Sequence, residues 1–205
     1  MNTRDPVRDR LLAVGCDLFA RQGYDGTSVR DITRRARANL GAITYHFGSK
    51  EALYHEVLAS RVEPLVTLVA RAAAHPGAAL DRIEAIIRTF LDYIAAHPEM
   101  PKLILRELAA ERPLPPPARQ AMQRNFGALV EAVAAGQRDG SIRPGEPAML
   151  AFSTMAQPFF FAIGARMILS ASGLDPRDPA IRAPMADHIV TTIRRALAAN
   201  ATVNP

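Results

Sequence analysis

The chain has 205 residues, a length that excludes a large multidomain enzyme. Its residues are 49% apolar and 22% charged, a composition that excludes a disordered chain. No apolar run approaches the roughly 18 residues of a membrane span, and the single cysteine excludes an intrachain disulfide and a thiolate cage for zinc. The net charge of +5 favours an anionic partner.

The basic charge is concentrated at the start of the chain. Residues 1–50 carry nine basic and five acidic side chains, a net charge of +4, while residues 51–205 carry 16 basic and 15 acidic ones. The start is also polar and lacks the apolar segment of a signal peptide, so we expect a cytoplasmic protein. The charge distribution predicts a segment that meets an anion such as nucleic acid, followed by a neutral remainder with another task.

Apolar side chains in the basic segment recur at steps of three and four residues, which predicts a first helix over residues 6–22. They are Val7, Leu11, Val14 and Leu18. After a turn with two glycines, Ser28 and Asp31 have the spacing of a capping box. This pattern predicts a second, short helix that ends near Arg35.

Two further caps follow at close spacing. Asn39 is placed to cap a third helix over about residues 40–47, and Ser49 to cap a fourth helix that opens with Lys50. Two short helices joined by a tight turn and packed on a longer first helix form a helix-turn-helix domain, which places one helix in the major groove of DNA.

The same segment carries a recognisable set of residues. They are Phe19, Gly23-Tyr24, Thr27 to Ile32, Gly41 to Ile43, Tyr45 to Phe47 and Ser49 to Tyr54. In this order, over about residues 7–60, they resemble the DNA-binding domain of the TetR family of bacterial transcription regulators. One position departs from the family pattern, because Arg37 stands where a glycine is usual, at a helix exit that favours left-handed backbone.

The resemblance implies an all-α protein with about nine helices. It divides the chain into an N-terminal three-helix helix-turn-helix domain that binds DNA, residues 1–50, and a C-terminal helical domain for ligand binding and dimerisation, residues 51–205.

Four residues are expected to contact DNA bases: Arg30, Leu40, Gly41 and Thr44. Arg30 matches a family position that reaches a base, and a bidentate arginine on guanine contributes about 1–3 kcal/mol of discrimination. A phosphate contact, or an ion pair with Asp25 or Asp31, is the alternative for Arg30. Leu40 has two possible positions, in the core or in the groove. Gly41 and Thr44 face away from the core residue Ile43.

Five residues are expected at the DNA phosphates: Thr27, Ser28, Tyr45, His46 and Lys50. The first two supply hydroxyls at a helix start, the rings supply donors, and the lysine lies at another helix start, where backbone amides attract anions. For Tyr45 and His46, packing inside the small domain is the alternative.

Helical periodicity continues through the rest of the chain, and proline and glycine separate its segments. The predicted helices lie near residues 50–74, 80–96, 100–111, 116–138, 147–169 and 180–199. Residues 148–169 are apolar around the whole helix, which favours burial against a second copy over a single core face. An ordinary central core helix is the alternative. The expected dimer residues are Phe152, Phe160, Met167, Ile189, Ile193 and Leu197.

The resemblance also implies a pocket for a small molecule. Its expected lining is soft and aromatic: Phe90, Tyr93, Met100, Ile104, Met122, Phe126, Met155 and Phe159. Any one of these side chains is also accounted for by ordinary core packing. The adjacent charges Arg106 and Glu107 could hold a ligand carboxylate or form a salt bridge, which is the favoured interpretation.

These patterns lead us to expect a homodimeric repressor that a small apolar or amphipathic effector releases from a near-palindromic DNA operator, with the protein at the nucleoid when bound. A transcriptional activator or a ligand-independent architectural protein is the alternative. We expect no enzyme, cofactor or metal site, since the five histidines lack ligand spacing and no glycine-rich phosphate loop is present.

Overall fold

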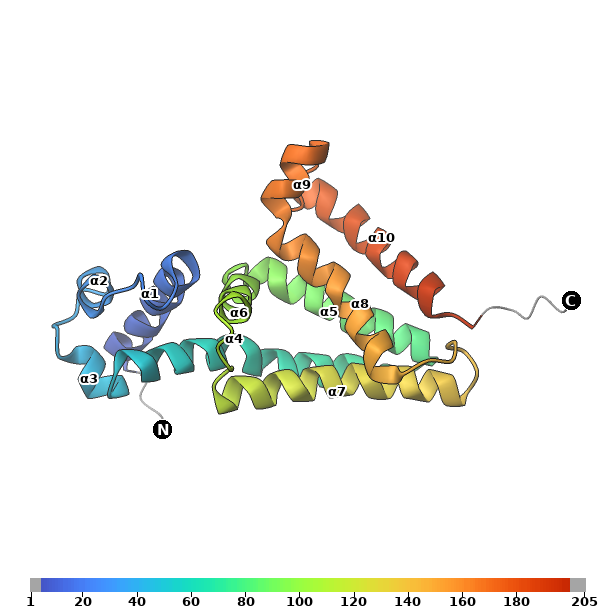
Figure 1. Cartoon of the computed structure of the whole chain (residues 1–205), viewed down its shortest axis with the longest axis horizontal. Helices are drawn as coiled ribbons and strands as arrows, with labels where there is room; N and C mark the ends of the chain where they lie inside the picture. Colours follow the sequence, from blue (N-terminus) through green and yellow to red (C-terminus); the bar gives the residue numbers. More distant parts are fainter. Residues whose placement is uncertain (1–4, 200–205) are drawn as a thin grey trace, which may run out of the picture. The chain divides into compact units, whose positions relative to one another are not determined.

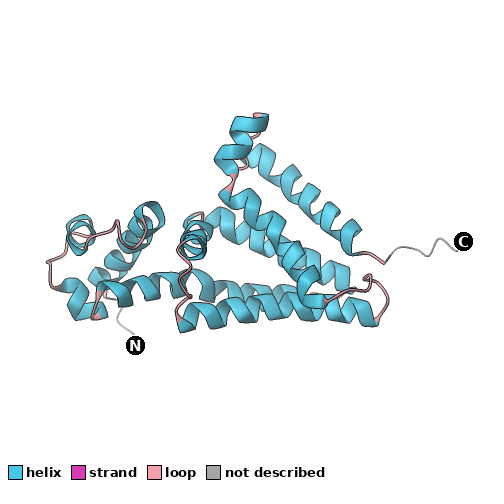
Figure 2. Ribbon diagram, viewed as in Figure 1, coloured by secondary structure: helices cyan, strands magenta, loops and turns pink. Residues whose placement is uncertain are grey.

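The computed structural model describes residues 5–199, and within them the chain forms ten helices and no strand (Figures 1 and 2). The helices are α1 (Pro6–Gln22), α2 (Val29–Arg35), α3 (Ala42–Phe47), α4 (Lys50–Ala73), α5 (Ala79–Ala96), α6 (Glu99–Ala109), α7 (Pro116–Arg138), α8 (Pro147–Ile163), α9 (Ala165–Ser172) and α10 (Pro179–Leu197). The all-α class is confirmed. One more helix is present than expected, because the segment 147–169 is broken in two.

The chain divides into two compact units. Unit 1 comprises the chain up to Glu63 together with Pro98–Ala121, and unit 2 comprises Pro64–His97 together with the chain from Met122 onward. Unit 1 thus holds the three helices of the expected DNA-binding domain, but also the start of α4 and all of α6.

The first two helices have the predicted bounds because their ends are encoded locally. Asp5 accepts hydrogen bonds from the backbone amides of Val7 and Arg8 at the start of α1, and Gly23 ends that helix with a φ of 78°. The Ser28 hydroxyl oxygen accepts from the Asp31 amide at 3.1 Å, which caps α2 as predicted. Fully buried side chains from four helices then close the core of unit 1: Leu11, Leu18, Phe19, Ile32, Ile43 and Leu53.

The third helix begins two residues later than predicted, and the predicted Asn39 cap is wrong. Gly41 is the N-cap of α3 and provides no side-chain bond. Asn39 instead contributes its backbone carbonyl, which accepts from the Ala42 amide at 3.1 Å. Leu40 therefore lies in a turn, where it is 54% exposed and excluded from the core.

Two helices of unit 1 end in the same strained way, with a left-handed residue other than glycine. Arg37 follows α2 and Glu111 follows α6, each with a φ of 52°. After each of them the next amide bonds back to a carbonyl five residues earlier, from Ala38 to Thr33 at 2.9 Å and from Arg112 to Glu107 at 3.1 Å. This is the Schellman motif, in which glycine is the usual left-handed residue. Arg37 therefore adopts the left-handed conformation expected at this position, although it is not a glycine.

Replacing Arg37 or Glu111 by glycine is expected to stabilise the protein by about 1 kcal/mol each, because glycine relieves the steric cost of left-handed backbone. Urea denaturation measures the change. Arg35→Gly is the matched control, since it falls inside α2 and should cost about 1 kcal/mol. Destabilisation by both Arg37→Gly and Glu111→Gly would contradict the strain argument.

Cys16 is expected to be unreactive in the native protein. The residue is 3% exposed, its Sγ accepts from Arg61 Nε at 3.1 Å, and burial raises the pKa of the thiol. Because the thiolate is the reactive form, an aromatic disulfide reagent at about pH 8 should modify no thiol in native protein and one thiol per chain in about 6 M guanidinium. Rapid modification of the native chain would show that α1 opens locally.

In unit 2, α5 packs against α8 and α10. The shared core includes Ile83, Ile86, Leu150, Ile189, Val190 and Ile193. At its edge Arg194 pairs with Asp81 at 2.8 Å and with Glu84 at 3.0 Å, which ties α10 to the start of α5.

The apolar segment 147–169 bends sharply where α8 meets α9. The two helices lie at 75° to each other, with the break at Gly164. A Cβ added there would lie 2.9 Å from the carbonyl oxygen of Phe160, so the bend needs a residue without a side chain. Across residues 5–199 no single helix is long and apolar enough to span a membrane, and α8 with α9 meets that criterion only as this bent pair.

Candidate nucleic-acid interface

The start of α3 presents an exposed surface in unit 1, which we call the α3 face. It consists of Leu40, Gly41, Thr44 and Tyr45. Tyr45 is 84% exposed, while Ile43 on the opposite side of the helix is buried in the core. The core contact therefore fixes the rotation of α3 and turns these four residues to solvent.

Arg30 is exposed in the first turn of α2. Neither ion pair considered for it forms: Asp31 pairs with Arg34 at 2.6 Å, and Asp25 with Arg112 at 3.4 Å. Most other arginines of the segment bind within the protein, as Arg10 does when its Nε donates to the Ala36 carbonyl at 3.0 Å.

Within residues 5–50, only Arg30 and Arg37 have a guanidinium that makes no ion pair or hydrogen bond in unit 1. Both are exposed. Long cationic side chains without an internal partner meet an anion without first breaking a bond inside the protein.

Thr27 differs from the expectation. Its side chain is 1% exposed, and its hydroxyl donates to the Gly23 carbonyl at 2.7 Å. This hydroxyl closes the turn between α1 and α2 and is not available to a phosphate. The neighbouring Ser28 is exposed, although its hydroxyl already bonds the Asp31 carboxylate at 2.6 Å.

His46 and Lys50 are held by neighbours. The His46 side chain is 11% exposed, and its Nδ1 lies 3.4 Å from a carboxylate oxygen of Asp5, so it packs within unit 1 as the alternative interpretation has it. The Lys50 ammonium lies 4.1 Å from the centre of the Tyr24 ring. This cation–π contact fixes the ammonium at the N-terminus of α4.

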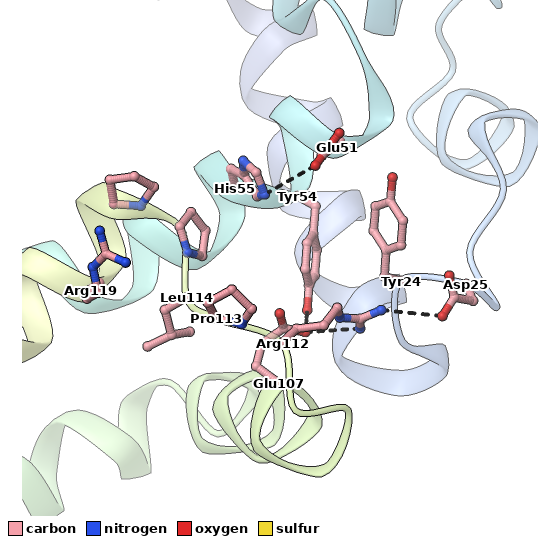
Figure 3. Close-up of a pocket in the computed structure, with 12 residues that line it drawn as sticks. Tyr24, Asp25, Glu51, Tyr54, His55, Glu107, Arg112, Pro113, Leu114 and Arg119 are labelled. Carbon is pink, nitrogen blue, oxygen red and sulfur yellow. Dashed lines mark hydrogen bonds and ion pairs between the residues drawn. The ribbon is translucent and has the colours of Figure 1, made fainter.

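The adjacent charges Arg106 and Glu107 on α6 each bind partners within unit 1, and the two sets of partners are different. The Arg106 guanidinium donates to the carbonyls of Ala20 and Arg21, where α1 ends and its dipole is negative. The Glu107 carboxylate is buried and accepts from the Tyr54 hydroxyl at 2.6 Å and from Arg112 at 3.1 Å (Figure 3). The expected salt bridge between the adjacent Arg106 and Glu107 is therefore wrong, because Glu107 pairs with Arg112 and Arg106 binds the end of α1.

A cavity of about 440 Å³ opens beside Glu107 and Arg112 in unit 1 (Figure 3). It is lined by Tyr24, Asp25, Glu51, Tyr54, His55, Glu107, Arg112, Pro113, Leu114, Pro115, Pro116 and Arg119. Burial and the bond to Glu107 raise the pKa of the Tyr54 hydroxyl, so it remains a donor. This cavity was not predicted from the sequence, and none of the eight expected ligand residues lines it.

The expected ligand residues are all buried or half-buried, with Met100 and Ile104 in unit 1 and the other six in unit 2. Phe90, Tyr93, Met100 and Ile104 are buried, and Met122, Phe126, Met155 and Phe159 are half-buried. Among the described residues no group of three or more histidine, cysteine or acidic side chains could hold a metal ion.

The expected dimer residues fall into two classes. Phe152, Phe160 and Met167 are exposed on α8 and α9, at 67%, 50% and 55%. Ile189, Ile193 and Leu197 of α10 differ from the expectation, because each is at most 5% exposed within the chain's own core. Their apolar stripe packs against α5 and α8, so they cannot also meet a second copy.

Comparisons with known proteins cover both parts of the chain. A family model described as bacterial regulatory proteins, tetR family, matches residues 11–57, and one described as tetracyclin repressor-like, C-terminal domain, matches residues 80–193. The transcriptional repressor SCO4008 of Streptomyces coelicolor is 33% identical over 150 residues, 72% of this chain and 74% of that protein. The regulator RutR of Escherichia coli K12 is 26% identical over 172 residues, 82% and 79% of the two chains.

Solved structures agree on the fold. A tetR-family regulatory protein from Rhodococcus RHA1 superposes with a TM-score of 0.78 at 19% identity, covering 96% of this chain and 99% of that one. The ketosteroid transcriptional regulator KstR2 of Mycobacterium tuberculosis gives 0.74 at 19% identity, covering 97% and 96%.

Proposed function

The chain belongs to the TetR family of DNA-binding transcriptional regulators, and from this membership we propose that it is a homodimeric repressor released from a near-palindromic operator by a small apolar or amphipathic effector. The observation that carries the proposal is the exposed α3 face, which lies in the same unit as two arginines without internal partners. The repressor assignment is supported by the similarity to SCO4008, which is named a repressor.

In the proposed complex α3 enters the major groove. Thr44 hydrogen-bonds a base edge, Leu40 meets a thymine methyl group, and Gly41 lets the backbone approach closely. Because this face offers few donors, Arg30 is the main base reader. Two copies of α3 bind half-sites one DNA turn apart, about 34–36 Å, on a near-palindrome.

The phosphates are bound at the edges of this face. Tyr45 and Lys50 donate directly, and Ser28 turns its hydroxyl from Asp31 to a phosphate oxygen. Thr27 and His46 are left with structural roles, because the hydroxyl and the ring have partners inside unit 1. When bound to its operator the protein resides at the nucleoid.

The dimer forms through α8 and α9. Six large apolar side chains are exposed from Met149 to Leu174, namely Met149, Phe152, Phe160, Met167, Leu169 and Leu174. Exposed apolar residues gathered in one segment are typical of a protein interface. An isologous two-fold contact between two copies of this segment covers them and gives the two DNA-binding units the symmetry of a palindrome.

The effector binds in unit 2, among the soft and aromatic side chains expected there: Phe90, Tyr93, Met122, Phe126, Met155 and Phe159. Their character suits an apolar ligand. Release follows if the effector binds better to a state with lower DNA affinity, and the decrease in DNA affinity equals that difference in effector affinity.

A gel shift with the DNA upstream of the protein's own gene tests the whole proposal. We expect retardation by purified protein, release on addition of an apolar extract of the producing cells, and higher expression of a reporter when the gene is deleted. Retardation that no extract reverses would favour a ligand-independent architectural protein. Lower reporter expression on deletion would favour an activator.

Replacing Arg30 by alanine is expected to relax the preference at one base pair in each half-site by about 1–3 kcal/mol, because alanine cannot form the bidentate hydrogen bonds of arginine with guanine. Binding to a set of operators that differ at single positions measures this effect. Arg34→Ala, which removes an exposed arginine of the same helix that is paired with Asp31, should leave base preference unchanged. A uniform decrease in affinity across all operators for Arg30→Ala would assign that side chain to a phosphate.

A further inference from the structure

We propose that Glu107 and Arg112, at the end of α6, are positioning residues for DNA binding. They hold the Tyr24 ring in place, and this ring holds the Lys50 ammonium at the N-terminus of α4. The proposal rests on the phosphate contact of Lys50 described under Proposed function, and it adds a buried carboxylate of α6 that sets the strength of that contact.

The first link is anchored in the interior of unit 1. The Glu107 side chain is 5% exposed, and one carboxylate oxygen accepts both the Tyr54 hydroxyl at 2.6 Å and Arg112 Nη2 at 3.1 Å (Figure 3). A buried carboxylate with two charge-assisted or short bonds is rigid, because losing either partner leaves a buried charge poorly satisfied. Glu107 therefore fixes the guanidinium of Arg112.

The backbone places Arg112 for this role. The left-handed Glu111 reverses the chain after α6, and the Arg112 amide bonds back to the Glu107 carbonyl. The main chain and the side chain of Arg112 thus both return to the same residue. A non-glycine residue in this strained conformation persists only where its surroundings fix it, as they do here.

The second link reaches the turn between α1 and α2. The other end of the Arg112 guanidinium lies 3.4 Å from the Asp25 carboxylate and 5.7 Å from the centre of the Tyr24 ring. Tyr24 also packs at 5.1 Å from the Tyr54 ring, which is itself bonded to Glu107. Glu107 therefore restrains Tyr24 by two routes, through Arg112 and through Tyr54.

The third link ends at the proposed DNA contact. Lys50 is the first residue of α4, and its ammonium lies 4.1 Å from the centre of the Tyr24 ring. Without a fixed ring the four-carbon stem of a lysine samples many rotamers, and ordering them on binding lowers affinity. An ammonium that is already ordered binds a phosphate without this loss of side-chain entropy.

Salt-dependent binding to a random-sequence duplex tests the proposal, since phosphate contacts are independent of sequence. Fluorescence anisotropy is measured for wild type, Arg112→Gln, Lys50→Ala and the double variant over a range of KCl concentrations. We expect each single variant to bind about tenfold more weakly at low salt. The slope of log K against log salt should become shallower by about 0.9 for each phosphate that Lys50 no longer neutralises. The double variant should be no weaker than Lys50→Ala by more than about twofold.

Arg119→Gln is the matched control, because it removes the same charge from an exposed position in unit 1 and should change binding less than about twofold. Glu107→Gln keeps an acceptor for Tyr54 and removes only the charge, so it provides a milder second variant if Arg112→Gln folds poorly. The proposal would be overturned if the decreases in affinity were additive in the double variant. It would also be overturned if the salt slope were unchanged in both Arg112→Gln and Glu107→Gln. Absence of effector release or of operator preference with this coupling intact would instead refute the proposed function alone.

Discussion

Replacement of Phe160 by aspartate is expected to convert the protein to a folded monomer that binds its operator at least about 100-fold more weakly. Phe160 is 50% exposed on α8, next to the bend at Gly164, so a charge is tolerated in the isolated chain. In a two-fold interface the same charge would be buried twice without a partner, which costs several kcal/mol. A monomer then binds one half-site only and forgoes the gain from binding two sites at once.

Light scattering after size exclusion measures the association state, and anisotropy on the operator measures the affinity. Leu108→Asp is the control, because Leu108 is an exposed apolar residue of α6 in unit 1, at 64%, outside the proposed interface. It should leave the dimer intact. A Phe160→Asp variant that remains dimeric at micromolar concentration would place the interface elsewhere.

Helix bounds were predictable where the sequence encodes the ends locally. Asp5 and Pro6 begin α1, Gly23 ends it, and Ser28 caps α2, so both helices have the bounds that the sequence predicts. Ser49 likewise caps α4, with its hydroxyl oxygen 3.0 Å from the Ala52 amide. Each of these signals acts over about three or four residues and needs no knowledge of the fold.

Predictions failed where tertiary structure chooses among local options. Asn39 is a good cap by type, but the turn uses its carbonyl instead of its side chain. The stripe of Ile189, Ile193 and Leu197 has the spacing of an interface helix and of a core helix alike. Only the packing of α10 on α5 and α8 shows that these side chains belong to the chain's own core.

The long-range hydrogen bonds of Arg106 and Glu107 in unit 1 could not be predicted from the sequence for a related reason. Tyr54 and Glu107 are separated by 53 positions, and Ala20 and Arg106 by 86. No periodicity or motif links residues so distant, and the adjacent pair Arg106–Glu107 suggested one site instead of two separate anchors. The one available signal was two charges inside an apolar helix, which indicates buried partners but does not name them.

Replacement of Phe19 by alanine is expected to lower the free energy of unfolding by about 3–5 kcal/mol and to abolish DNA binding, because it leaves a cavity in the core of unit 1. Phe19 is fully buried and meets the Tyr54 ring edge to face, with ring centres 4.8 Å apart. It therefore supports the same ring that Glu107 bonds. Removal of this support should loosen α1 and α4 together, which are the two helices that frame α2 and α3.

The chain itself supplies a probe for this effect. It has no tryptophan, and three of its four tyrosines, Tyr24, Tyr45 and Tyr54, lie in unit 1. Tyrosine fluorescence during urea denaturation therefore reports mainly on unit 1, while circular dichroism reports on all helices. If Phe19→Ala destabilises unit 1 selectively, the fluorescence midpoint should fall further than the dichroism midpoint. Coincident transitions that shift equally would show that the two units unfold as one cooperative structure.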